Sequence, residues 1–201
     1  ILDEATRLAA LRTGKVGFGG MGSYWQINSL DDFESLQKTT DLELWPFYQR
    51  SNYSFSLNVT EPPFSDIRVR KAMQMALDLE TINDTYYLGF ADWQNPRWNG
   101  QPGYYTPFEE WPAELKQYYT YDPEGAEKLL DEAGYPRGTD GVRFKVEYTH
   151  RDVIDLGYTE IAASYWADIG VEVTTRIQDT GTWVGSRKDH TYEMITGDMA
   201  M

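Results

Sequence analysis

The sequence predicts an α/β fold in which helices pack on a sheet with parallel strands. Near the C-terminal end, residues 142–148 alternate apolar and polar side chains, residues 158–169 carry one apolar helical face, and residues 171–177 alternate again. Two strands joined by a helix of this length pair in parallel with a right-handed crossover. A further alternating run at 53–59, followed by a helix with an apolar stripe, adds to the same plan.

The N-terminal elements are two helices separated by an extended piece. Apolar residues within 2–11 predict a helix that Gly14 closes in the left-handed conformation. A short strand is expected at Lys15–Phe18. Ser29 and Asp32 have the spacing of a capping box, so the next helix is expected to begin there.

The glycines of residues 17–22 match the dinucleotide fingerprint G-x-G-x-x-G. That fingerprint holds a pyrophosphate only where a helix begins directly after the glycines, because the helix N-terminus supplies the N–H donors. Here Tyr24, Trp25, Gln26 and Ile27 intervene. We therefore expect a flexible crossing at this point rather than a nucleotide site.

The middle of the chain is expected to contain two extended runs and two helices. Leu42–Tyr48 and Tyr53–Val59 are the extended runs, and a proline pair at 62–63 ends the second one. Ser65 or Asp66 can cap the helix that follows, whose apolar stripe must face a core. The stripe consists of Val69, Ala72, Met73, Ala76 and Leu77. Asp78 is expected to cap a further helix with Leu79, Ile82 and Tyr86 on its inner side.

Residues 90–111 form an aromatic stretch without helical or strand periodicity. Loops this long in a compact domain are usually functional or disordered, and the aromatic content argues against disorder. Two interpretations remain open. The rings pin the loop to the domain, or Trp93 or Trp98 lines a ligand cleft, since rigid amphipathic rings recur at recognition surfaces.

The last third of the chain adds three elements to the strand–helix–strand pattern. Asp122 and Pro123 begin a helix that Gly134 and Pro136 stop. A short helix near Trp183 and a final strand at Tyr192–Thr196 complete the domain.

Composition excludes several classes of function. The 201 residues carry 18 Lys and Arg against 32 Asp and Glu, so the net charge of −14 disfavours nucleic-acid binding. Without cysteine there can be no disulfide, thiolate catalysis or Cys-ligated metal. No apolar run is long enough to span a bilayer, and no signal peptide is visible. Because the chain opens at Ile1 in a helical pattern and stops at Met201 within a strand pattern, we expect a piece of a longer protein.

No residue pattern predicts catalysis, a metal site or a cofactor. An enzyme needs a nucleophile, a base and an electrostatic stabiliser that converge. The only histidines, His150 and His190, have no metal-ligand spacing, and we expect both in solvated loops. A hydrolase with an acidic cleft stays an alternative only if its catalytic groups lie elsewhere in a longer protein.

Three stretches resemble the family-5 extracellular solute-binding proteins, the peptide-binding components of ABC importers. Residues 62–78, PPFSDIRVRKAMQMALD, are similar to the family pattern pPF.D.RVR.A...A.D. Residues 121–136, YDPEGAEKLLDEAGYP, are similar to yDpekAkkLLaeAGyp, and residues 167–173 to l..iGI.v.l. The opening residues resemble a...l.sGevDi, except that Gly17 stands where the family usually has Asp.

The resemblance implies a periplasmic-binding-protein type II-like lobe, a mixed sheet flanked by helices that forms one half of a two-lobed clamshell. Residues 1–201 would be the C-terminal ligand-binding lobe, with 1–28 and 194–201 near the interlobe crossings. The implied function is extracytoplasmic capture of an oligopeptide by hinge closure and its delivery to ABC permease subunits. The protein would be periplasmic or extracellular, reaching the membrane only through the permease or a lipid anchor outside this segment. Alternatives are an oligosaccharide or a nickel chelate as ligand, and a surface module that binds unfolded chains without closing.

The resemblance also implies ligand-binding residues. Trp183 stands where family members often carry an aromatic that faces the ligand. Arg187 follows one helical turn later, and its guanidinium suits a ligand carboxylate. Asn58 precedes the prolines, a position where the family often has Asn, and is a further candidate beside Trp93 and Trp98. The alternative is a buried Trp183 with Arg187 on the surface.

Overall fold

The computed structural model describes residues 4–16, 30–43, 53–87, 89, 91, 106–152 and 156–198. The chain divides into two compact units, residues 1–48 and 49–201. The predicted glycine-rich crossing at 17–22, most of the extended run at 42–48, and both Trp93 and Trp98 lie outside the described residues.

The first unit contains two helices, α1 (Glu4–Arg12) and α2 (Leu30–Thr39). Leu8, Leu11 and Leu36 form their buried contact, and Arg12 pairs with Asp32 at 3.2 Å. Gly14 ends α1 with φ +67°, which confirms the predicted left-handed position. The predicted strand at 15–18 is not formed where the chain is described, because Lys15 and Val16 bond back to the carbonyl of Ala10.

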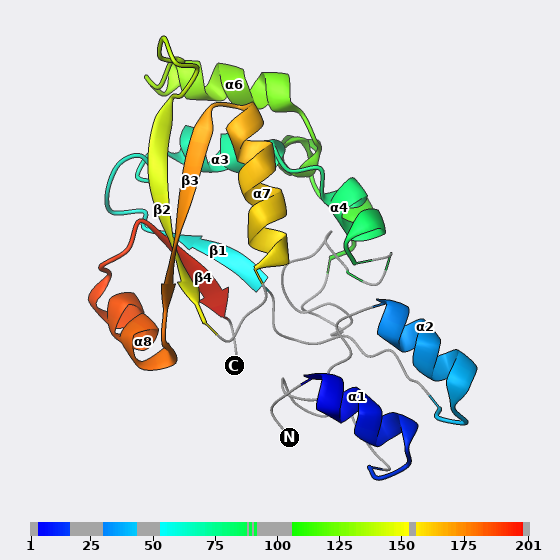
Figure 1. Cartoon of the computed structure of the whole chain (residues 1–201). Coiled ribbons are helices and arrows are strands. Elements are labelled where there is room, and N and C mark those ends of the chain that lie inside the picture. The colour runs from blue at the N-terminus through cyan, green and yellow to red at the C-terminus, as the bar shows by residue number, and fades with distance from the viewer. Residues whose placement is uncertain are drawn as a thin grey trace. The chain divides into compact units, whose positions relative to one another are not determined.

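The second unit is built on a four-stranded mixed sheet in the order β1–β4–β2–β3 (Figure 1). Its strands are β1 (Tyr53–Leu57), β2 (Phe144–Arg151), β3 (Val171–Gln178) and β4 (Met194–Asp198). β2 and β3 are parallel, as the strand–helix–strand pattern predicts, and β2 is also parallel to β4. β1 and β4 are antiparallel.

The helices of this unit begin at the predicted caps. α3 (Ile67–Met75) is capped by Asp66 rather than Ser65, since the Asp66 carboxylate accepts from the Arg68 N–H at 2.8 Å. α4 (Leu79–Thr85) is capped by Asp78, and α6 (Pro123–Glu132) by Asp122. α7 (Gly157–Asp168) crosses from β2 to β3, and α8 (Thr180–Asp189) follows β3 directly.

Three short helices within 108–119 had no sequence signal. They are η1 (Phe108–Glu110), α5 (Ala113–Lys116) and η2 (Gln117–Tyr119). The last strand lies two residues later than the predicted Tyr192–Thr196. β1 ends at Leu57, and the N–H of Asn58 instead donates to the carbonyl of Glu193 at 2.8 Å.

One apolar core lies between the sheet and the helices α3, α6 and α7. Val69, Ala72, Met73, Ala76 and Leu77 are all buried, so the predicted stripe faces the core as expected. The indole N–H of Trp166 on α7 donates to the carbonyl of Met73 on α3 at 2.9 Å, which fixes the two helices to each other. Phe55 of β1 packs on Trp166 with ring centres 4.8 Å apart.

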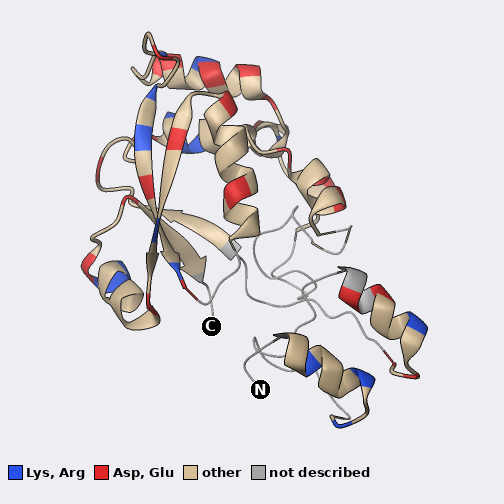
Figure 2. Ribbon diagram, in the orientation of Figure 1, with Lys and Arg blue, Asp and Glu red and all other residues tan. Residues whose placement is uncertain are grey.

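The opposite face of the β2–β3 pair is polar. Lys145 pairs with Glu172, its register partner, at 2.7 Å, and Arg176 pairs diagonally with Glu147 at 3.0 Å. Figure 2 shows basic and acidic residues next to each other along β2 and on α6. The strands therefore follow the period of two that separates a core face from a polar face. Figure 1 shows α6 across the end where β2 and β3 begin and α8 beside the end where they finish.

Candidate functional site

The candidate site lies where the parallel strands β2 and β3 end and α8 begins. In open α/β sheets, ligands bind beyond the carboxyl ends of the strands. Asp179 connects β3 to α8, and its carboxylate accepts from the N–H groups of Gly181 and Thr182 at 2.9 and 3.1 Å. The Thr182 hydroxyl and N–H together hold the pKa of Asp179 below its ordinary value. This cap fixes the first turn of α8, which carries Trp183.

Trp183 is the centre of the site. Its side chain is buried, with 3% of the residue exposed. The guanidinium carbons of Arg151 and Arg187 lie 5.1 and 5.2 Å from the centre of its indole, each within cation–π range. Two guanidinium groups are therefore gathered around one buried ring, although the chain carries a net charge of −14.

The structure thus brings Trp183 and Arg187 together, as their spacing of one helical turn suggested. The indole is buried, as the alternative interpretation expected, while Arg187 is half-buried beside it rather than fully on the surface. Arg151 was missed. It is the last residue of β2 and lies opposite Gln178, the last residue of β3. The alternation of the strand predicts its face, but only the strand register and the position of α8 bring it to Trp183.

Two buried polar atoms at this end of the sheet have no hydrogen-bond partner among the residues that the structure describes. They are the indole Nε1 of Trp183, a donor, and the side-chain oxygen of Gln178, an acceptor. Buried polar atoms are almost always paired, with protein or with ordered water. An unpaired donor and an unpaired acceptor close to two guanidinium groups suit the binding of a polar ligand.

The two histidines differ from each other. The prediction of a solvated loop is wrong for His150, which lies in β2 with 1% of the residue exposed and its ring 5.7 Å from that of Tyr148. His150 belongs to the row of Phe144, Val146 and Tyr148, which faces the core, so strand alternation buries it. His190 is exposed at the end of α8 with φ +57°, as expected for a loop residue.

Asn58 lies at the other end of α8, and its side chain is fully bonded. The amide nitrogen donates to the carbonyl of Tyr192 at 3.1 Å, and the amide oxygen accepts from the N–H and hydroxyl of Thr60 at 3.2 and 2.7 Å. It thereby holds the segment between α8 and β4. Asn58 is not brought into contact with Trp183 in the described contacts, and the predicted contributions of Trp93 and Trp98 lie outside the described residues.

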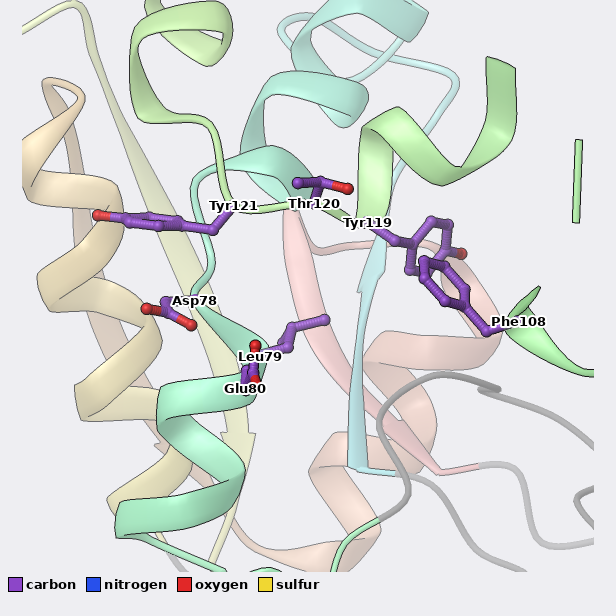
Figure 3. Close-up of a pocket in the computed structure, with 7 residues that line it drawn as sticks. All are labelled: Asp78, Leu79, Glu80, Phe108, Tyr119, Thr120 and Tyr121. Atoms are coloured by element: carbon purple, nitrogen blue, oxygen red, sulfur yellow. The ribbon is translucent and has the colours of Figure 1, made fainter. Parts of the chain in front are cut away.

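A cavity of about 380 Å³ opens on another part of this unit (Figure 3). Of the sequence-predicted site residues that the structure describes, Asn58, Trp183 and Arg187, none is among its lining residues. Its walls come from the start of α4, from η1 and from the end of η2, and the lining residues are Asp78, Leu79, Glu80, Phe108, Tyr119, Thr120 and Tyr121.

The described residues contain no group of three or more His, Cys, Asp or Glu side chains placed to hold a metal ion. Within the same residues, no helix combines the length and apolar character that crossing a bilayer requires.

Comparisons with known proteins agree on one family. The model of the bacterial extracellular solute-binding proteins, family 5 Middle, matches residues 1–200. The glutathione-binding protein GsiB of Salmonella typhimurium is 27% identical over 184 residues, which cover 90% of this chain and 32% of GsiB. The GsiB of Pectobacterium atrosepticum is 25% identical over 181 residues, with the same coverage. The chain spans about a third of the length of these relatives.

Solved structures show the same fold. NikA from Brucella suis in complex with Fe(III)-EDTA has a TM-score of 0.70 at 24% identity, covering 99% of this chain and 40% of NikA. DppA from Helicobacter pylori in complex with the peptide STSA has a TM-score of 0.66 at 22% identity, covering 100% of this chain and 36% of DppA. The mixed sheet flanked by helices is thus the predicted type II-like α/β fold, and the chain belongs to the family 5 bacterial extracellular solute-binding proteins.

Proposed function

We propose that the protein containing this chain captures a small solute outside the cytoplasm and delivers it to an ABC importer. Membership of the solute-binding family supports this proposal. Relatives named as binding proteins support it further, since GsiB is named for glutathione and the DppA structure contains a peptide. The protein would be periplasmic or extracellular and would meet the membrane through the permease subunits, or through a lipid anchor outside this segment.

The solute is proposed to be a peptide bound through a carboxylate. The observation that carries this step is the pair of guanidinium groups around Trp183, because guanidinium binds carboxylate through paired, charge-assisted hydrogen bonds. Every unblocked peptide has a C-terminal carboxylate, and glutathione carries two. The unpaired indole N–H of Trp183 offers one more donor, and the Gln178 oxygen offers an acceptor for a peptide N–H.

Asn58, Trp93 and Trp98 complete the proposed set of ligand-binding residues in different ways. Asn58 is proposed to position the site rather than to contact the ligand, because it bonds to the segment that follows α8. Trp93 and Trp98 are proposed to contact the ligand with their rings, as the aromatic stretch at 90–111 suggests.

The proposed mechanism is binding with hinge closure. This chain would form one lobe, residues 1–28 and 194–201 would lie near the crossings to the other lobe, and the ligand would bridge the two. A ligand that contacts both lobes stabilises the closed form, which the permease then recognises. We propose no catalytic step, because the groups around Trp183 are cations and amides, which bind an anion without attacking it.

The proposal is tested on the whole protein by calorimetry with a tetrapeptide and its C-terminally amidated form. Arg187→Met should weaken binding of the unblocked peptide about 30-fold or more, since truncating one partner of a desolvated charge pair costs several kcal/mol. Binding of the amidated peptide should change little. Lys188→Met is the matched control, because Lys188 is an exposed neighbour and its substitution removes the same charge.

An equal loss for both peptides, or no loss, would contradict the carboxylate contact. Native mass spectrometry of the purified protein then identifies what it carries, and release of a sugar instead of a peptide would favour the oligosaccharide alternative. The 201-residue chain alone should bind the peptide weakly or undetectably, because the other lobe would supply half of the contacts.

A further inference from the structure

The cavity between α4 and η2 has walls that suit a ligand different from the proposed solute. Three of its lining residues are aromatic: Phe108, Tyr119 and Tyr121. In Figure 3 the rings of Phe108 and Tyr119 lie next to each other on one side, and Asp78 and Tyr121 lie on the other. A volume of about 380 Å³ is within the range of small-molecule sites, about 300–1,000 Å³.

The aromatic walls are held in place from outside the cavity. The Trp111 ring packs on Phe108 at 5.5 Å and on Tyr119 at 5.1 Å between ring centres. Tyr121 packs on Tyr165 of α7 at 5.8 Å. These contacts fix the rings before any ligand arrives, so their faces offer preorganised, electron-rich surfaces.

Two carboxylates complete the lining, and neither has a basic partner within 4 Å in the described part of the chain. They belong to Asp78 and Glu80. Asp78 accepts from the N–H and hydroxyl of Thr81 at 3.0 and 2.7 Å, which fixes its position. Its charge, after burial, contributes to the raised pKa of Tyr165. The cavity therefore combines negative charge with aromatic faces.

The same aromatic cluster already contacts one ammonium group. The Nζ atom of Lys116 lies 5.8 Å from the centre of the Phe108 ring and donates to the carbonyl of Glu109 at 2.6 Å. Lys116 is not one of the lining residues, and no basic side chain is among those that the structure describes around the cavity.

We propose that this cavity binds an organic cation, a primary ammonium or guanidinium group. Such a cation satisfies both features at once, because it pairs with a carboxylate and stacks on aromatic faces. A bare metal ion would gain little from the rings, and two carboxylates are too few to enclose it. The cation could belong to a free amine or to a Lys or Arg side chain of a partner. The inference does not depend on the proposed peptide site, because the two share no residue.

The test is a titration of the ¹⁵N-labelled chain with n-butylammonium chloride, followed by amide chemical shifts at constant ionic strength. Saturable shifts are expected at residues 78–80 and 119–121 and not around Trp183. Butan-1-ol, the neutral analogue, should cause no saturable shifts there. Equal effects of the alcohol and the amine, or amine shifts that map elsewhere, would overturn the proposal.

Variants separate a specific site from general attraction to an acidic protein. Glu80→Gln should weaken amine binding about three- to fivefold, the range for a partly exposed ion pair. Asp84→Asn is the matched control, since it removes one charge from the same helix without lining the cavity, and it should change affinity less than about twofold. An equal effect of both variants would reject the site.

Two more comparisons test whether the Tyr119 ring contributes to binding and whether the cation is a free amine or a side chain of a partner. Tyr119→Phe should retain amine binding while Tyr119→Leu should lose it, with thermal unfolding checked for both because Tyr119 packs on Trp111. A capped Gly-Lys-Gly peptide that binds more tightly than butylammonium would indicate a partner's side chain. Equal affinities would indicate a free amine, and no binding of either would refute the proposal.

Discussion

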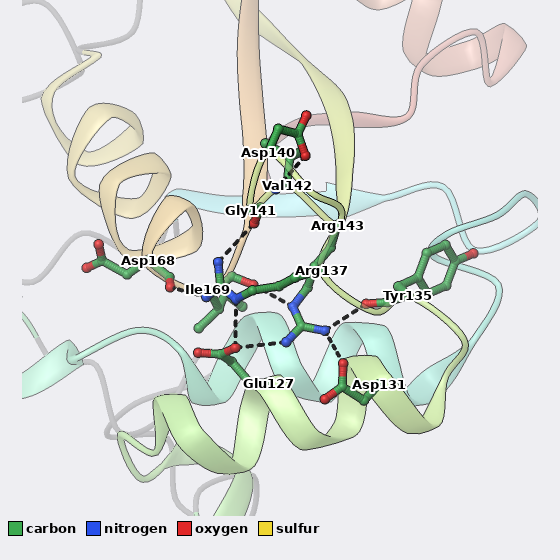
Figure 4. Close-up of polar contacts among 10 residues, drawn as sticks. All are labelled: Glu127, Asp131, Tyr135, Arg137, Asp140, Gly141, Val142, Arg143, Asp168 and Ile169. Atoms are coloured by element: carbon green, nitrogen blue, oxygen red, sulfur yellow. Dashed lines mark hydrogen bonds and ion pairs between the residues drawn. The ribbon is translucent and has the colours of Figure 1, made fainter.

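Replacing Arg143 by methionine should destabilise the chain more than any exposed ion-pair mutation. The Arg143 side chain is 2% exposed and lies between α6 and the β2–β3 end of the sheet (Figure 4). Its guanidinium donates to the carboxylates of Glu127, at 2.8 Å, and Asp131. It also donates to the carbonyls of Tyr135 and Ile169, at 2.7 and 3.0 Å. One side chain therefore joins α6, the turn after it and the end of α7.

The size of the effect follows from what methionine would leave unpaired. The carboxylates of Glu127 and Asp131 are 36% and 56% exposed, so water can replace the guanidinium there. Ile169 is fully buried and Tyr135 is half-buried, and an unsatisfied buried group costs about 1–3 kcal/mol. We expect a loss of about 2–4 kcal/mol, near the lower end for breaking a buried ion pair.

Urea unfolding followed by circular dichroism measures this loss. With a slope of about 1–3 kcal/mol per M, the midpoint should fall by about 1–2 M. Lys145→Met is the control, because its pair with Glu172 is exposed on both sides and should contribute about 0–1 kcal/mol. If Arg143→Met lowered the free energy of unfolding no more than Lys145→Met, the reasoning would be refuted.

The same contacts predict how the difference depends on pH. Hydrogen bonds from Arg137 and then Arg143 lower the pKa of Glu127 from 4.5 to about 2. A carboxylate with a lowered pKa in the folded state stabilises it above pH 4.5, and this contribution is lost as the pH falls towards 2. In Arg143→Met, only Arg137 still donates to the Glu127 carboxylate, so this variant loses less stability than the unmodified chain as the pH falls. The stability difference between the two proteins should therefore shrink between pH 5 and pH 2.5, by less than about 1 kcal/mol because Glu127 is partly exposed.

Two further predictions concern the strands beside the site. Asn58→Ala removes the hydrogen bonds to Tyr192 and Thr60 at a residue that is only 9% exposed. It should lower the free energy of unfolding, measured in urea, by about 1–3 kcal/mol. A change below about 0.5 kcal/mol would show that water replaces these bonds. Gly197→Ala would place a Cβ 2.8 Å from the carbonyl oxygen of Ser54, so β1 and β4 must separate. This should cost about 1–3 kcal/mol and reduce amide-exchange protection in β1, while an unchanged exchange pattern would contradict it.

Elements set by local chemistry could be predicted closely from the sequence. The caps at Asp66, Asp78 and Asp122 and the left-handed Gly14 depend on one or two residues next to the helix end. The parallel pairing of β2 and β3 depends on the length of the connection, which is also local. The segment 108–119 was not predicted as helical, because its three pieces are single turns, too short to show a helical period.

Only the part of the candidate site that lies on a single helix was predicted from the sequence. Trp183 and Arg187 are one turn apart, so their proximity follows from helix geometry alone. Arg151 is far from both in sequence, and only the register that sets it opposite Gln178 brings it to the indole. His150 was misjudged because its charged neighbours suggested a loop, whereas the alternation of β2 gives it a core-facing position and Arg151 the opposite one.

The position of α8 therefore decides whether these separate residues form one site. Asp179 fixes the start of the helix through three hydrogen bonds from Gly181 and Thr182, and Asn58 fixes the segment after its end. Trp183 lies between these two anchors, with a guanidinium from β2 and another from α8 at its ring. In the described contacts, neither the Asp179 carboxylate nor the Asn58 side chain touches the indole, yet we expect a change at either to shift the helix and separate the two guanidinium groups. The carboxylate contact proposed here would thus depend on residues that a search for charged or aromatic side chains near Trp183 does not find.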